Sequence, residues 1–199
     1  MHANGQTTMP AVQCPRGGKY IGIDAIDPVA IIAGMDTQTL LAALDFARDR
    51  LLGSIQTIEK SGQDPARVLA WRPGPGRAHI GWQLLHCAAT HHKHLYATLQ
   101  GKPIPNEKLV SDFAGGSTPS DSNLPGLDSI KQTLASTFSE FRQYVANLDP
   151  GDLASRRVGP PGRERLLGEW IILYTWHEAH HQGQIHLTWN LYRAAHGLT

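Results

Sequence analysis

Residues 177–186 read HEAHHQGQIH and lie inside the longest helical pattern of the chain, from about residue 165 to residue 195. A helix turns by about 100° per residue, so His177 and His181, four residues apart, lie within about 40° of each other on one face. The residues that share this face are mostly apolar or aromatic: Leu166, Trp170, Leu173, Tyr174, Leu191 and Tyr192. The sequence therefore predicts that both histidines point into a helical core.

Two imidazoles in a core need partners for their ring nitrogens, and apolar neighbours supply none. A metal ion solves this problem by taking one lone pair from each ring. The spacing of His177 and His181 suits two ligands on adjacent coordination positions of one ion. The alternative is a pair of core histidines that bond to other side chains or to water.

A third ligand should come from another helix, because two imidazoles hold a metal ion weakly. Residues 82–92 read WQLLHCAATHH and supply His86. Trp82 and Thr90 lie on the same helix face as His86, and small alanines beside them leave room for an ion. Lys93 is on that face too, which fits only if it lies near the mouth of a pocket.

The predicted metal ligands are thus His86, His177 and His181. Trp82 and Gln184 are predicted to line the pocket or to support the ligands, because each lies close to the ligand face of its helix. Three neutral ligands leave a coordination position open, which is typical of a catalytic rather than a structural site. Zinc fits such a site best, and nickel or iron(II) would also bind.

The other histidines of the two clusters are predicted to lie outside the site. His91 and His92 are turned roughly 120 to 140° away from His86 and are expected at the surface. His94 and His180 are assigned to the surface as well. His79 shares the face of His86, but it lies about 10 Å earlier along the helix axis and should not reach the same ion.

The fold class expected from the whole chain is all-α. Three further segments have helical periodicity, and they span about residues 36–60, 79–100 and 127–148. With the segment at 165–195 they predict a four-helix bundle over residues 36–199, with a long Gly/Ser/Pro-rich connection, residues 102–125, between the second and third helices. Residues 1–35 form an extra N-terminal arm, partly irregular, in which residues 19–23 are the one candidate for a short strand.

Composition excludes several classes of partner. The 199 residues contain 18 Lys and Arg against 17 Asp and Glu, a net charge of +1, which gives no electrostatic footprint for nucleic acid or an anionic membrane. The two cysteines, Cys14 and Cys87, form neither a disulfide framework nor a metal motif. No segment resembles a signal peptide or a membrane span. The expectation is a soluble, cytoplasmic protein.

His177, Glu178 and His181 also spell HExxH, the signature of zinc proteases, in which the glutamate is the general base. Two features speak against a protease. No Asp or Glu follows Glu178 to act as a further ligand, and the extended protease motif would need Gly and His where the chain has Gln184 and Leu187. Glu178 stays a weak catalytic candidate, and it is expected to face solvent because it lies about 100° from His177.

These motifs resemble the DinB-like superfamily, which includes the YfiT-type proteins. The resemblance covers about residues 36–195 and is carried by WRPGPGRAHIGWQLLHCA, which leads to His86, and by HEAHHQGQ, which starts at His177. It implies a four-helix bundle, a metal ion on the three matching histidines, His86, His177 and His181, and a homodimer. The chain departs from the family in its N-terminal arm and at Gln182, where arginine is more common.

The resemblance also implies a class of function. Several such proteins are similar to thiol-dependent transferases or isomerases that work with small cytoplasmic thiols. The leading hypothesis is therefore a small-molecule metalloenzyme in which the metal activates a thiol or water. Two rivals remain open: a metal-binding stress-response module without turnover, and a bundle in which the metal only joins the helices.

Overall fold

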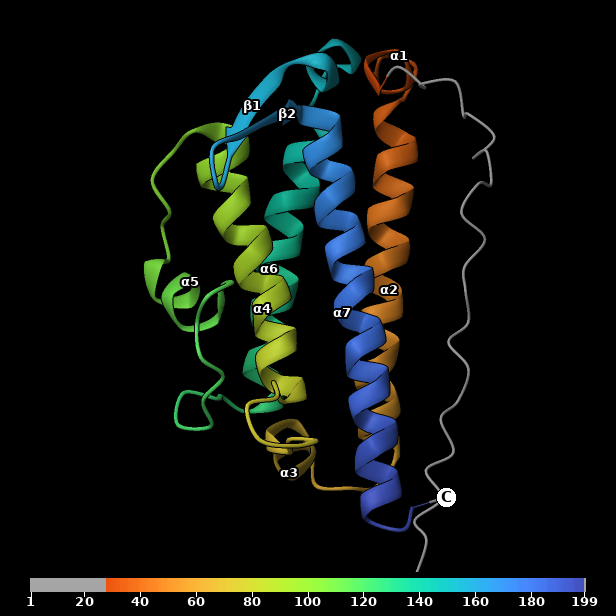
Figure 1. The fold of residues 1–199 in the computed structure, drawn as a ribbon. Helices are drawn as coiled ribbons and strands as arrows, with labels where there is room; N and C mark the ends of the chain where they lie inside the picture. Colours follow the sequence, from red (N-terminus) through yellow and green to blue (C-terminus); the bar gives the residue numbers. More distant parts are fainter. Residues whose placement is uncertain (1–27, 199) are drawn as a thin grey trace, which may run out of the picture.

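The structure is a computed structural model that describes residues 28–198, and these residues are mostly helical, as predicted. Four long helices run side by side (Figure 1). They are α2 (Thr37–Lys60), α4 (Ile80–Lys93), α6 (Leu127–Ala146) and α7 (Leu167–Ala195), and α4 continues without a break into a π-helical segment, η1 (His94–Gln100). These elements match the four predicted segments to within a few residues.

Each long helix buries an apolar face against two others. Helix α2 packs on α6 and α7, and α4 packs on the same two helices from the other side. The core has two apolar clusters. One surrounds Leu84, Ile130 and Tyr192, and the other surrounds Leu44, Phe141 and Trp170. Burial of these faces, at about 25 cal/mol per Å² of apolar surface, is the main force that holds the helices together.

The predicted connection between the second and third helices contains a short helix, α5 (Glu107–Phe113). Asn106 caps it, because its side-chain oxygen accepts a hydrogen bond of 3.0 Å from the backbone N–H of Leu109. Leu109 and Phe113 are buried against α4. The connection is therefore folded onto the bundle and reaches the face of α4 that carries His86.

A two-stranded sheet was not expected from the sequence. Strand β1 (Arg156–Gly159) pairs antiparallel with β2 (Arg163–Leu166), so α7 begins at Leu167 and not near residue 165. The strands are too short and too rich in arginine to show an apolar alternation. Gly159 lies under Trp170, and a Cβ atom there would come within 2.5 Å of the Trp170 ring. This close contact ties the hairpin to the start of α7.

Three other short helices complete the fold: α1 (Pro28–Ala33), α3 (Pro65–Ala70) and a 3₁₀ helix, η2 (Pro150–Ala154). Helix α1 belongs to the predicted N-terminal arm, and Ile32 buries its side chain in the second core cluster. The candidate strand at residues 19–23 lies outside the described residues. Within residues 28–198, no helix is both long and apolar enough to cross a membrane.

Candidate metal centre

Helix α4 presents His86 toward α7. The helix begins after His79, whose Nδ1 accepts a hydrogen bond of 2.9 Å from the backbone N–H of Trp82. His86 is buried, and its Nδ1 lies 2.7 Å from the carbonyl oxygen of Phe113 at the end of α5. A carbonyl only accepts, so Nδ1 donates and the lone pair of His86 is on Nε2. This bond both fixes the tautomer and holds the ring in place.

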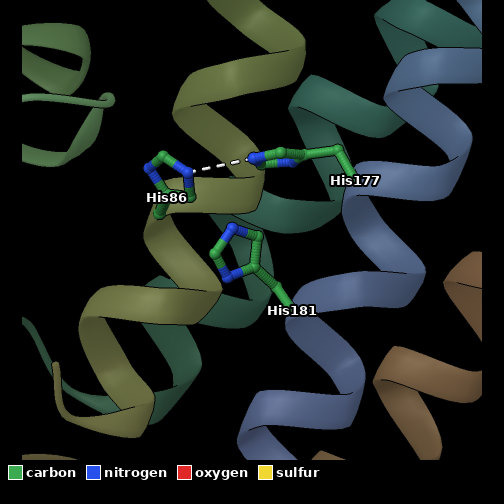
Figure 2. A group of neighbouring side chains, drawn as sticks. All are labelled: His86, His177 and His181. Atoms are coloured by element: carbon green, nitrogen blue, oxygen red, sulfur yellow. Dashed lines mark hydrogen bonds between the residues drawn. The ribbon is translucent and has the colours of Figure 1, made fainter. Parts of the chain in front are cut away.

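Helix α7 presents His177 and His181 to the same spot (Figure 2). The Nε2 atoms of His86 and His177 are 3.0 Å apart. The ring of His181 lies with its centroid 4.6 Å from that of His86 and 4.5 Å from that of His177. One ring nitrogen from each of the three histidines lies within 4.8 Å of the other two. The structure thus brings together the three residues that the sequence suggested as ligands.

The three rings are held uncharged. Burial lowers the pKa of His86, and it lowers the pKa of His177 to about 2 and that of His181 to about 4, helped by the neighbouring imidazoles. Neutral imidazoles are the form that binds metals. Nitrogens that share one Zn²⁺ at about 2.0–2.1 Å lie roughly 3.0–3.5 Å apart, so the 3.0 Å between His86 and His177 fits one ion.

Two ring nitrogens at this site have no protein partner. The Nδ1 atoms of His177 and His181 are buried, and neither makes a hydrogen bond with any residue that the structure describes. The unpaired Nδ1 atom of His177 is distinct from its Nε2 atom, which faces His86 and would be the ligand atom. The donor set, its charge state and its spacing all fit a divalent ion.

The two predicted supporting residues have different places. Trp82 stacks on His86, with ring centroids 4.6 Å apart and planes 11° from parallel, and its Nε1 donates to Ser117 Oγ at 3.2 Å. Gln184 is exposed, with its side-chain amide 2.9 Å from the Nε2 of His180. Gln184 also lies beside His181 and raises the pKa of that ring, although burial lowers this pKa by more. Gln184 does not line the cavity of about 310 Å³ that adjoins the histidines.

A cavity of about 310 Å³ opens beside the histidines. His86 and Lys93 of α4 form one wall, and Trp170, Tyr174 and His177 of α7 form another. The chain just after α5 and the turn between β1 and β2 close the remaining sides. A small molecule in this cavity therefore has direct access to the imidazoles of His86 and His177.

The family model described as the DinB superfamily matches residues 43–185. The chain belongs to the DinB superfamily. A crystal structure of a conserved protein from Enterococcus faecalis is similar in fold, with a TM-score of 0.61 and 16% sequence identity over 78% of this chain and 95% of the other. No curated protein matches the chain.

This DinB superfamily chain buries more histidines than the sequence suggested. His91 and His92 are buried, so their predicted place at the surface is wrong. His92 accepts a hydrogen bond of 3.1 Å from the backbone N–H of Asn106 and so anchors α5. His94 is half-buried and lines the cavity. The reason is that α4 touches α3, α5, α6 and α7, which leaves it almost no solvent-facing side.

Glu178 is not a solvent-facing residue either, because its side chain is 1% exposed. Arg48 of α2 binds both of its oxygens, with Nε 2.8 Å from Oε1 and a terminal nitrogen 3.0 Å from Oε2. Burial raises the pKa of Glu178, and the guanidinium opposes that effect. A general base must reach the attacking water, whereas this carboxylate is buried in an ion pair with Arg48.

Arg48 is the residue of this DinB-like core that sequence reasoning missed. Its guanidinium also donates to the carbonyl oxygen of Leu134 at 3.2 Å and lies 4.3 Å from the centre of the Phe138 ring. A signal for it existed, because Arg48 falls in the apolar stripe of α2, four residues after Leu44 and three before Leu51. A charged residue in such a stripe indicates a buried partner on a neighbouring helix.

Acid should destabilise the protein through His91. Burial, followed by the charge of Arg48, lowers the pKa of His91 to about 3, whereas an unfolded histidine titrates near 6.5. The unfolded state therefore binds the extra proton below pH 6.5, and the folded state loses up to about 1.4 kcal/mol of stability per pH unit from this group. At pH 5 the loss should be about 2 kcal/mol, measured by urea unfolding.

The matched variant is His91→Phe, which keeps an aromatic ring against Phe141. It should be less stable than the wild type at pH 7, but the gap should narrow by about 2 kcal/mol at pH 5. His186→Gln, on the exposed side of α7, should follow the wild type at both pH values. Equal pH dependence in His91→Phe and the wild type would show that His91 is not the group responsible.

Proposed function

We propose that the chain is a metal-dependent small-molecule enzyme in which His86, His177 and His181 hold one divalent ion, on a four-helix bundle of the DinB-like type. The observation that carries the proposal is the convergence of three uncharged imidazoles, two buried and one half-buried, at the edge of a cavity. Zinc suits three histidine ligands best, and nickel and iron(II) are the alternatives. A closed structural zinc site would use four protein ligands, so three favour an open, catalytic one.

The chain's own residues prepare this site. The carbonyl of Phe113 keeps the proton of His86 on Nδ1, so that Nε2 faces the other two rings. Trp82 stacks on one face of the His86 ring and limits the rotation of that ring. When bound, the ion would supply a Lewis acid that polarises a carbonyl or makes a thiol more nucleophilic. Trp170 and Tyr174 make the cavity wall largely aromatic, which weakens competition from water.

The reaction class that we propose is a thiol-dependent transfer or isomerisation, with a low-molecular-weight thiol as one substrate. Family resemblance supports the thiol, and the cavity beside the histidines supports a small-molecule substrate. A non-catalytic metal-binding stress-response module would use the same three ligands, but it would not need this cavity. The buried Arg48–Glu178 pair removes the main support for a zinc protease.

The homodimer expected from the resemblance stays a prediction. Phe46 on α2 and Ile172 and Trp176 on α7 are large apolar side chains that are at least 40% exposed and line one groove. Exposed apolar surface of this kind is commonly an interaction site. It is separate from the cavity at the histidines, which lies on the side of α7 that faces α4.

The thiol can be tested by alkylation. Protein loaded with zinc is mixed with an equimolar amount of 2-mercaptoethanol, and the rate of its reaction with iodoacetamide is followed by mass spectrometry of the small molecule. We expect zinc-loaded protein to speed this alkylation at pH 7, because coordination removes the thiol proton and the thiolate is the reactive form. Metal-free protein and His181→Ala should have no effect. Equal rates in all samples would contradict a thiol site at the metal.

A further inference from the structure

The cavity beside the three histidines contains one charged side chain. Lys93, the last residue of α4, lines it, and none of the other lining residues is Asp or Glu. Among residues 28–198, no carboxylate lies within ion-pair distance of the Lys93 ammonium, although several other lysines and arginines have such partners. Lys93 is half-buried, so its charge is only partly screened by solvent.

Lys93 and His86 lie on the same face of α4. They are seven residues apart, which is two helical turns or about 10 Å along the axis, and lysine side chains on a helix lean back toward its N-terminus. The backbone of Lys93 therefore lies at one end of the cavity, about two helical turns from His86, and its side chain leans back toward the imidazoles. The volume of about 310 Å³ equals that of on the order of ten water molecules. One small molecule can fill it and reach both ends.

The walls between these two ends concentrate the positive charge. Trp170, Leu173 and Tyr174 provide apolar and aromatic surface, and a cleft with such walls and charges of one sign focuses its field on the ligand. Directly after Lys93 the helix changes to the π-helical segment η1. π-Helical turns are rare and are frequent at functional sites. The apolar walls and the change to a π-helix therefore both occur at the end of the cavity where Lys93 lies.

We propose that the cavity binds a small organic anion, with its oxyanion at Lys93 and its reactive end at His86, His177 and His181. The oxyanion is a carboxylate or a phosphate-type group, since a lysine binds either as a point charge. Lys93 in this scheme decides which substrates enter and how they are oriented. The inference rests on the proposed metal site and adds to it the charge of the substrate.

The test uses hydroxamic acids, whose hydroxamate group binds zinc directly. Each probe has two to four methylenes and ends in a carboxylate, a phosphonate, a methyl or an ammonium group. Binding to zinc-loaded protein is measured by calorimetry for the wild type, Lys93→Met, Lys93→Arg and Lys93→Glu. Lys102→Met is the control, because Lys102 is exposed and lies outside the cavity.

We expect an anionic probe to bind the wild type at least tenfold tighter than its methyl-ended analogue. Lys93→Met should abolish this preference, Lys93→Arg should restore most of it, and Lys93→Glu should favour the ammonium-ended probe. The better of the two anionic probes identifies the group. Equal binding of all probes to the wild type, or an unchanged preference in Lys93→Met, would overturn the proposal. Failure of every hydroxamate to bind would instead overturn the metal site on which it rests.

Discussion

Replacing His181 with alanine should remove the metal from the protein. The variant leaves only His86 and His177, and two imidazoles make a weak site. Loss of a residue that merely supports a ligand costs about 10- to 100-fold in affinity, so loss of a ligand should cost more than about 100-fold. Elemental analysis of protein made without an affinity tag should show about one divalent ion per chain in the wild type and almost none in His181→Ala.

Two further variants make this result specific. His180→Ala changes the exposed neighbour of His181 and should keep the full metal content. His86→Ala should lose the metal as His181→Ala does, although the HExxH motif on α7 is still complete in it. Full occupancy in His181→Ala would refute the ligand assignment. Full occupancy in His86→Ala would favour a site on α7 alone.

Replacing Arg48 with methionine should reduce the free energy of unfolding by about 3–5 kcal/mol. This change leaves the carboxylate of Glu178 buried without its partner, and an uncompensated buried charge is strongly destabilising. The hydrogen bond to Leu134 is lost as well. Urea unfolding monitored by circular dichroism measures the effect, and a loss below 1 kcal/mol would show that the pair does not matter for stability.

The control is a second ion pair of the same geometry at the surface. Arg142 binds both oxygens of Asp45, at 2.8 and 2.9 Å, but both side chains are exposed. Arg142→Met should cost at most about 1 kcal/mol. The double variant Arg48→Met/Glu178→Leu should recover part of the stability, because it removes the buried charge together with its partner. Equal losses in the two single variants would contradict the role of burial.

The cluster of three histidines could be predicted from the sequence because its geometry is mostly local. His177 and His181 are four residues apart, and that spacing alone places them on one face of any α-helix. Their apolar neighbours indicate that this face is buried. His86 was found by the same argument on α4. What local spacing could not supply was the hydrogen bond from His86 to Phe113, because that partner comes from α5, 27 residues away in the chain.

The wrong predictions concern residues whose helix face was known but whose surroundings were not. His91 and Glu178 were correctly turned away from the ligand face, and we expected solvent there. In the structure α4 is enclosed by α3, α5, α6 and α7, and α7 meets α2 on the side that carries Glu178. His91 and Glu178 consequently lie next to each other, with His91 Nε2 3.4 Å from the Glu178 carboxylate, and Arg48 contacts both of them.

By itself, the sequence determined the four long helices, their order and, on α4 and α7, the faces that carry the three histidines. These properties depend on helical periodicity and on residues that start and end helices, and both act over a few residues along the chain. Only the tertiary structure decided which of the remaining faces are buried, which partners Arg48 and His86 find, and that Lys93 lies in a cavity free of carboxylates. These depend on which helices become neighbours, and packing between distant segments sets that arrangement.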